Sequence, residues 1–263
     1  MSVAPMAATY AYSIASAIRA SLADRGNFLL QAASMVLNNG FMLALWFMFF
    51  AGFHSVGGWR LSDMALLVGI IMTIVGVTGV FFGGYRDLAA TILSGEIDAL
   101  LTQPRSILVR LLARDSIATA WGDLFTGAAI LAGFAHLTPQ GLPWFAVGWS
   151  AGLIVYLAAG VTFASMAFWL RGARSLARDL VEFVILACSY PGSIYSGASK
   201  LIAYSLLPAG FIVLTPVKLL RTPDFVTLAT LLGAALIYAA IAAGAFHLGL
   251  RRYQRGSTPT VSM

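Results

Sequence analysis

Long apolar blocks, each about 20 residues in length, constrain the fold of this chain more than any other feature. A helix of that length spans the roughly 30 Å hydrocarbon layer of a bilayer. Backbone groups inside hydrocarbon must be hydrogen-bonded within the protein, which leaves helices or the strands of a closed barrel. Barrel strands alternate apolar and polar residues, and these blocks do not. The chain is 60% hydrophobic and 10% charged, against roughly 25% charged in a soluble domain. We therefore predict an all-α membrane protein.

The blocks predict six transmembrane helices. They cover residues 28–53, 61–83, 117–137 and 144–170, a fifth begins near Leu180, and a sixth covers residues 225–250. The transmembrane domain thus occupies residues 27–255, and residues 256–263 form a flexible cytoplasmic tail. Residues 1–26 carry Tyr10, Ile14 and Ile18 at helical spacing and are predicted to lie along the inner membrane surface as an amphipathic helix. The first block is too long for a cleaved signal, so we expect it to stay in the mature protein.

The basic residues predict the orientation. Of the 16 Lys and Arg residues, 12 fall in segments that are inside when the N-terminus is inside, and 4 fall outside. Positive residues accumulate on the cytoplasmic side of membrane proteins. We expect both termini to be cytoplasmic in a multi-pass protein of a bacterial inner membrane. The net charge of +6 is explained by these flanking residues, so nucleic acid is not an expected partner.

The apolar stretch from Leu180 to Leu220 is too long for one span and is interrupted by helix-breaking residues. Two full crossings would place the basic C-terminal residues outside. We therefore predict one crossing followed by two short helices that dip into the outer leaflet and leave on the same side. We call residues 190–220 the hairpin segment; its breaks are at Pro191, Gly192, Gly197, Pro208 and Pro216.

The inside loop over residues 85–115, which we call the loop segment, mixes leucine and isoleucine with acids. Leu88, Ile92 and Ile97 alternate with acidic residues such as Glu96, and Pro104 ends the run. This pattern favours docking to a soluble partner over insertion into lipid. An ordinary solvated loop is the alternative.

Several catalytic and metal sites are excluded by their missing residues. A phosphate-binding P-loop needs Gly-Lys-Ser/Thr, but the two lysines, Lys200 and Lys218, do not follow a glycine. The three histidines lack zinc-ligand spacing, and Cys188 is the single cysteine and is expected in the core. Serine–glycine pairs lack the leading glycine of an intramembrane serine protease. We expect a non-catalytic chain with no metal and no cofactor of its own.

Polar residues inside the predicted spans have two interpretations. Asn38 and Asn39 lie mid-span and could serve as interhelical hydrogen-bond partners or line a substrate pathway. Asp123 could pair with a basic residue near Arg114 or Arg178, or reach interfacial water. An ion-pair network is expected at the start of the fifth span; its members are Arg174, Arg178, Asp179 and Glu182. Small residues at four-residue spacing, such as Gly148–Gly152 and Ala240–Gly244, indicate close helix packing.

Three sequence elements resemble those of a known family. They are Gly58-Trp59 with Asp63, the run Ser-Gly-Glu-Ile-Asp-Ala-Leu-Leu-Thr-Gln-Pro from Ser94 to Pro104, and the hairpin sequences Tyr190-Pro191-Gly192-Ser193-Ile194-Tyr195, Leu207-Pro208-Ala209 and Thr215-Pro216. Nearly the whole chain resembles the permease subunit of prokaryotic ABC-2-type transporters of about 260 residues.

This resemblance implies an N-terminal elbow helix, six spans and a re-entrant extracellular hairpin between the last two. It also implies that the loop segment couples to a separate ATPase subunit, through Arg86, Gly95, Glu96, Asp98, Leu101, Pro104 and Arg105. The hairpin would line or cap the outer exit, with Tyr190, Pro191, Tyr195, Pro208 and Pro216 as gate candidates.

The implied assembly has two permease chains, identical or paralogous, with two ATPase subunits that carry the ATP and Mg. Export from the cytoplasm or inner leaflet, in contact with membrane lipids, is the implied direction. One rival is an ion-coupled secondary transporter, which would normally show inverted repeats or acids deep in the bundle. An intramembrane enzyme is the other.

Overall fold

The computed structural model describes residues 3–53, 55, 57–101, 106–134 and 138–256, and every secondary-structure element in them is helical. The long helices are α2 (Arg25–Gly52), α3 (Leu61–Phe81), α7 (Ala118–Phe134), α8 (Leu142–Ser165), α9 (Ala173–Cys188) and α12 (Phe225–Gly256). The shorter elements are α1 (Val3–Ser21), η1 (Gly83–Tyr85), α4 (Leu88–Leu93), α5 (Asp98–Leu101), α6 (Ile107–Leu112), η2 (Met166–Phe168), η3 (Gly192–Ile194), α10 (Gly197–Ala203), η4 (Gly210–Leu214) and α11 (Thr215–Arg221). The expected all-α class is confirmed.

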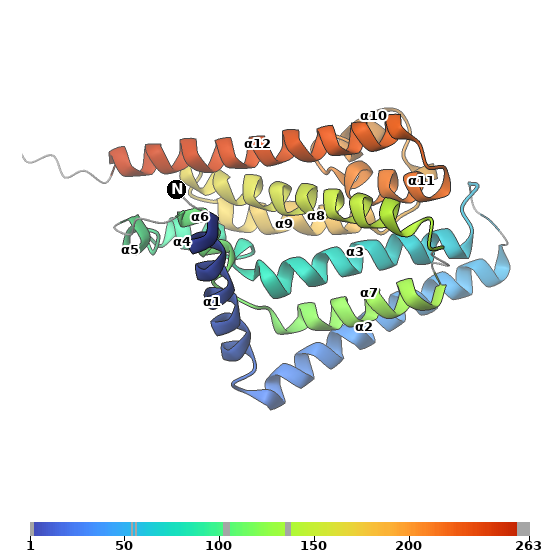
Figure 1. Ribbon diagram of the computed structural model, residues 1–263, viewed down its shortest axis with the longest axis horizontal. Coiled ribbons are helices and arrows are strands. Elements are labelled where there is room, and N and C mark those ends of the chain that lie inside the picture. The colour runs from blue at the N-terminus through green and yellow to red at the C-terminus, as the bar shows by residue number, and fades with distance from the viewer. Residues whose placement is uncertain (1–2, 54, 56, 102–105, 135–137, 257–263) are drawn as a thin grey trace, which may run out of the picture.

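The long helices form an elongated bundle with two distinct ends (Figure 1). One end, the loop end, holds α1, α4, α5, α6 and the C-terminal part of α12. The other, the hairpin end, holds α10 and α11. The loop segment and the hairpin segment therefore lie at opposite ends of the bundle.

Helix α3 lies at the centre of the core. It is apolar on all sides, and Leu67, Ile70 and Ile74 are fully buried between α7 and α8. A helix without a polar face must be surrounded by protein or lipid on all sides. Of the most apolar part of α3, 89% is buried inside the chain, against 11% for α2 and 28% for α12. The outer helices thus leave broad apolar faces for lipid or for another chain.

Among the described residues, four helices are long and apolar enough to cross a membrane: α2, α3, α8 extended to Phe168, and α12. Helices α7 and α9 have 17 and 16 residues, and fall short of the roughly 20 that a span requires. Charged side chains occupy the first turns of α9, from Arg174 to Glu182, which shortens its apolar part. Four of the six predicted spans therefore correspond to helices of full length, and the count of six stays a prediction. Residues 135–137 of the third block lie outside the described residues.

The hairpin segment is broken at Pro191–Gly192 and at Pro208, and α10 begins at Gly197, as predicted. The predicted break at Pro216 is wrong, because this residue lies in the first turn of α11, where a missing N–H is tolerated. Pro208 and Pro216 flank the π-helical turn η4, and Pro216 has no N–H to donate within the helix. The Thr215 hydroxyl donates to the Gly210 carbonyl at 2.7 Å, and this satisfies one of the carbonyls in the turn. Ile212, Val213 and most of their neighbours are buried against α8 and α3. Re-entry into a membrane stays a prediction, but protein covers this π-helical turn, as irregular backbone in hydrocarbon would require.

Helix α1 crosses the loop end at a steep angle to the bundle (Figure 1). The Tyr10 hydroxyl donates to the Phe81 carbonyl at 2.5 Å, and Ile14 and Ala17 are buried. Its apolar face thus packs on the protein, at the end of α3 and on the loop segment. The amphipathic pattern predicted this helix, whereas its role as a membrane-surface elbow stays a prediction.

Glycine pairs at four-residue spacing have different surroundings. A Cβ added to Gly152 would collide with the backbone carbonyl oxygen of Ile212, and one at Gly148 would touch Pro216 at 3.4 Å. A Cβ added to Gly244 meets nothing within 4 Å. Close packing therefore explains Gly152, where α8 approaches η4, and gives no reason for Gly244 within this chain.

We expect Gly152→Ala to lower the free energy of unfolding by about 2 kcal/mol, because the added methyl group forces α8 away from η4. Gly244→Ala is the matched control and should be neutral or stabilise by up to about 1 kcal/mol through helix propensity. Thermal unfolding of both purified variants in detergent micelles measures the difference. Equal melting temperatures would contradict the close contact at Gly152.

Candidate functional site

The loop segment is folded onto the end of the bundle. Four apolar side chains of the loop segment are at most 2% exposed: Leu88, Ile92, Ile97 and Leu111. The apolar residues that gave the segment its mixed pattern thus form its attachment to the bundle. Its acids are left on the outer side, where Glu96 and Asp98 are exposed.

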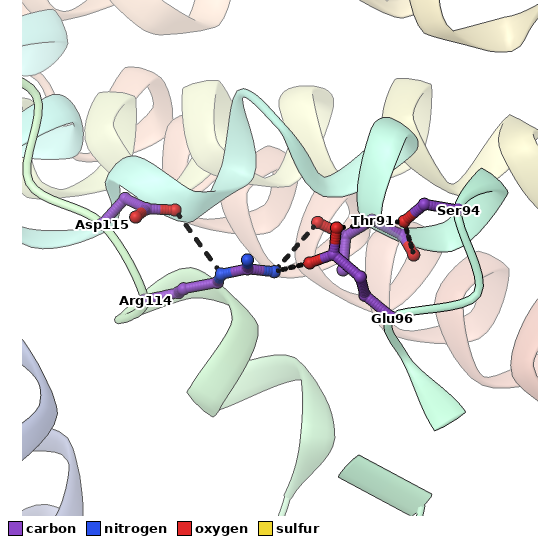
Figure 2. Close-up of polar contacts among 5 residues, drawn as sticks. All are labelled: Thr91, Ser94, Glu96, Arg114 and Asp115. Atoms are coloured by element: carbon purple, nitrogen blue, oxygen red, sulfur yellow. Dashed lines mark hydrogen bonds and ion pairs between the residues drawn. The ribbon is translucent and has the colours of Figure 1, made fainter. Parts of the chain in front are cut away.

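Gly95 makes the turn that presents these acids. Its φ of +78° lies in the left-handed region, which residues with a Cβ rarely adopt. The turn separates α4 from the short α5, so that Glu96 points back toward α6 (Figure 2). The Gly-Glu pair of the sequence motif therefore has a local structural reason.

Glu96 forms an ion pair with Arg114. The Arg114 Nη1 atom lies 2.6 Å from Glu96 Oε2, and also donates to the Thr91 hydroxyl at 3.4 Å (Figure 2). The Ser94 hydroxyl donates to Glu96 Oε1 at 3.3 Å. The hydrogen bond and charge of Arg114 hold the pKa of the Glu96 carboxyl below its ordinary value of 4.5. Both side chains are about half exposed, so the pair orients the carboxylate more than it stabilises the fold.

A groove runs between α1 and the loop segment. It has a volume of about 600 Å³ and is lined by small residues of α1, including Ser16 and Ala20, and by Glu96, Leu100 and Arg114 on the opposite side. Its floor is apolar and its rim carries charge of both signs. A groove of this kind can receive a short element of a partner protein with complementary charges.

The remaining residues predicted for docking are dispersed. Asp98 is exposed and forms a hydrogen bond with Tyr253 near the end of α12, and Leu101 is half-buried at the end of α5. Pro104 and Arg105 lie outside the described residues. Arg86 is turned away from the groove and lines a separate cavity beside α9.

The ion pairs at the start of α9 differ from the expected network. Arg178 pairs with Asp87 of the loop segment, with Nη2 and Oδ1 2.8 Å apart. Neither Asp179 nor Glu182 forms an ion pair among the described residues. The prediction of a network within this stretch is wrong, because helical spacing and tertiary packing turn Arg178 toward the loop segment.

Asn39 and Asp123 form a buried polar contact between α2 and α7. The Asn39 amide donates to Asp123 Oδ1 at 2.9 Å, and both side chains are buried. The expected pairing of Asp123 with an arginine or interfacial water is therefore wrong, since its partner is an amide inside the bundle. Asn38 is exposed on the chain surface, so the two neighbouring amides do not share a face.

The hairpin end carries a second charged contact. Arg221 at the end of α11 makes a bidentate pair with Asp63 at the start of α3, with distances of 2.5 and 2.8 Å. Its guanidinium also lies 4.4 Å above the ring of Trp59, which is 8% exposed. Two residues of the sequence motif before α3 thus hold the end of the hairpin segment.

The gate candidates lie at this hairpin end. The ring of Tyr190 packs edge-on to Trp46 at 6.2 Å, and the Tyr195 hydroxyl donates to the Ala187 carbonyl at 2.6 Å. Pro191, Pro208 and Pro216 are buried. The structure groups these residues around the breaks of the hairpin segment, while their role as a gate stays a prediction.

Sequence reasoning missed three of these contacts. The partners in Asp63–Arg221, Asp98–Tyr253 and Tyr85–Tyr156 lie on different helices, and no local pattern connects them. The available signals were indirect: a single acid, Asp63, at the start of the second apolar block and a tyrosine, Tyr85, shortly after its end.

A family model described as an ABC-2 family transporter protein matches residues 36–257 of this chain. The match takes in the loop segment, the hairpin segment and α2 through α12 except the first turns of α2. Comparison with curated proteins and with solved structures gives no match.

The pKa of Glu96 provides a test of the ion pair. We expect it to lie below 4.5, and to return toward 4.5 in Arg114→Gln, because the hydrogen bond and the positive charge are removed together. The stability that this pair contributes is present above pH 4.5 and is lost as the pH falls through the lowered pKa. Carboxyl NMR of labelled protein measures the shift. Arg174→Gln, an exposed charge on α9, should leave it unchanged.

The Asp63–Arg221 contact should stabilise the hairpin end. Arg221→Gln is expected to lower the free energy of unfolding by about 2 kcal/mol, since it removes a charged bidentate pair and a cation–π contact. Lys218→Gln removes the same charge one turn earlier on α11, from an exposed side chain, and should change stability by less than about 0.5 kcal/mol. Similar melting temperatures for the two variants would argue against an anchoring role.

Proposed function

This chain belongs to the ABC-2 transporter family, and on that premise we propose that it is the membrane-spanning permease subunit of an ATP-driven exporter. It would form the translocation pathway and leave ATP hydrolysis to a separate subunit. The observation that carries the proposal is the family match, which covers both the loop segment and the hairpin segment in one continuous stretch.

The proposed membrane arrangement has six crossings. Helices α7 and α9 would complete the set given by α2, α3, α8 and α12, because both lie lengthwise in the bundle (Figure 1). A 17-residue helix is about 26 Å long, which nearly spans the hydrocarbon layer. The loop end would be cytoplasmic, in agreement with the positive-inside distribution of arginine. Helix α1 would then be an elbow helix at the inner surface, and the hairpin segment would be re-entrant from outside.

The groove beside α1 is the proposed ATPase-docking site. Glu96 and Arg114 place charges of both signs on its rim, and Leu100 contributes apolar surface. Because buried leucine and isoleucine side chains fix the loop segment to the bundle, a push on the groove would move the helices as well as the loop. The ATPase subunit would bring ATP and Mg, and two copies are expected per transporter.

A second permease chain, identical or paralogous, would complete the pathway. Asn38 supports this, because it lies on the same face of α2 as Phe41 and Leu45, which are 77% and 62% exposed. An amide in the middle of a lipid-facing surface would lack a hydrogen-bond partner, whereas a facing chain or a wet pathway would provide one. We propose that this face of α2 is turned toward the second chain or the pathway.

Reversal of charge in the loop segment tests the coupling. The double variant Glu96→Lys with Asp98→Lys should lower ATPase activity that depends on this chain by about tenfold or more, because like charges would then oppose each other across the interface. ATP hydrolysis by the co-purified ATPase complex in nanodiscs is the measurement. Insertion and dimer formation should be retained.

Lys200→Glu is the control, since it reverses an exposed charge on α10 at the opposite end of the bundle and should leave coupled hydrolysis unchanged. Unaltered coupling in the double variant would remove the docking role from these acids. Transport by the purified chain with no ATPase present would overturn the proposed function itself.

A further inference from the structure

Arg86 has an unusual environment for a charged residue. It follows η1 at the loop end and is partly buried, and its Nε donates to the Tyr85 hydroxyl at 3.4 Å. That hydroxyl is in turn 2.9 Å from the hydroxyl of Tyr156, and both tyrosines are 2% exposed. Within the described part of the chain, no carboxylate lies within 4.0 Å of the guanidinium.

Arg86 lines a cavity of about 520 Å³ between the loop segment, α8 and α9. Its apolar lining residues include Ile117, Ala164 and Val181. Asp179 and Glu182 also line the cavity and, among the described residues, form no ion pair. A volume of this size falls in the range of small-ligand sites, roughly 300–1,000 Å³.

The charges of this cavity select a ligand class. The guanidinium of Arg86 meets no carboxylate within 4.0 Å among the described residues, so its planar fork can bind a carboxylate or phosphate group of a ligand in a bidentate manner. Asp179 and Glu182 would repel a ligand that carried only negative charge, but would attract an amine. The other charged pair in the lining, Asp87 and Arg178, is already internally neutralised at 2.8 Å.

We propose that this cavity binds the headgroup of a zwitterionic amphiphile, with its oxyanion on Arg86, its amine facing Asp179 and Glu182, and its apolar part along Ile117, Ala164 and Val181. Binding of this ligand does not depend on the proposed function. That the ligand represents the exported substrate class does rest on the proposed function. The cavity lies at the loop end, so the ligand would be taken from the cytoplasmic leaflet.

Binding to the purified chain alone, in maltoside micelles, tests the assignment by isothermal titration calorimetry. The probe is dihexanoyl phosphatidylethanolamine, compared with dihexanoyl phosphatidylglycerol, which lacks the amine, and with phosphoethanolamine, which lacks the acyl chains. We expect the first to bind at least tenfold more tightly than either of the others. Arg86→Gln should weaken its binding at least tenfold, and Arg174→Gln, which removes an exposed charge outside the cavity, should change it less than twofold.

Glu182→Gln separates the amine contact from the oxyanion contact. It should weaken phosphatidylethanolamine binding about threefold or more and leave phosphatidylglycerol binding unchanged or stronger. If Arg86→Gln does not fold, Arg86→Lys keeps the positive charge but lacks the bidentate geometry of the guanidinium, and should still weaken binding of the probe.

Each contrary result overturns a stated part of the proposal. Absence of binding to the unmodified chain, or equal binding by Arg86→Gln, removes the site. Equal affinity for phosphoethanolamine identifies a free small zwitterion as the ligand and overturns the amphiphile. Equal affinity for phosphatidylglycerol overturns the amine contact. Because no ATPase is present, failure here leaves the coupling experiment standing, and failure of coupling leaves this binding standing.

Discussion

The need to satisfy every backbone hydrogen bond inside hydrocarbon governs the architecture of this chain. Irregular backbone is found at the two ends of the bundle and, within the hairpin segment, at a π-helical turn that α8 and α3 cover. Pro216 lies in the first turn of α11, directly after this π-helical turn, while the Thr215 hydroxyl donates to the Gly210 carbonyl and Gly152 lets α8 approach the turn. Two uncharged residues, Thr215 and Gly152, thus allow the irregular turn to pack inside the bundle.

The two faces of the loop segment have different chemistry. One face forms, with α1, an open groove whose rim carries Glu96 and Arg114. The other face closes a cavity in which Arg86 lies near Tyr85 and the acids of α9. Since a single short segment lines both sites, occupation of one would be sensed at the other through the buried leucine and isoleucine residues between them. Under the proposed function, this arrangement would link ligand binding in the cavity to ATPase docking at the groove.

Periodic and local signals were sufficient to predict much of this fold. Apolar block length predicted the long helices, and proline and glycine predicted the breaks of the hairpin segment except at Pro216. Alternation of leucine with acids predicted a loop segment that docks to a soluble partner, but not that its leucine and isoleucine side chains are buried against the bundle. Contacts between distant residues were beyond such signals. Asn39 and Asp123 are 84 positions apart, and Asp63 and Arg221 are 158 apart, so that only packing brings them together. Arg86 was expected on the docking face but lines the cavity on the other side of the loop segment. Its sequence neighbours do not indicate toward which side of the loop segment its side chain points.

Helix α12 runs through the bundle as a single element of 32 residues. Near its C-terminal end Tyr253 bonds to Asp98 of the loop segment, and about 22 Å along the axis the Tyr238 hydroxyl donates to the Ser205 carbonyl of the hairpin segment at 2.6 Å. An unbroken α-helix resists bending over such a length, so α12 forms a stiff connection between the loop segment and the hairpin segment. Under the proposed function, a tilt of α12 imposed at the loop end by the ATPase would displace residues 204–205 at the hairpin end directly, without a relay through the other helices.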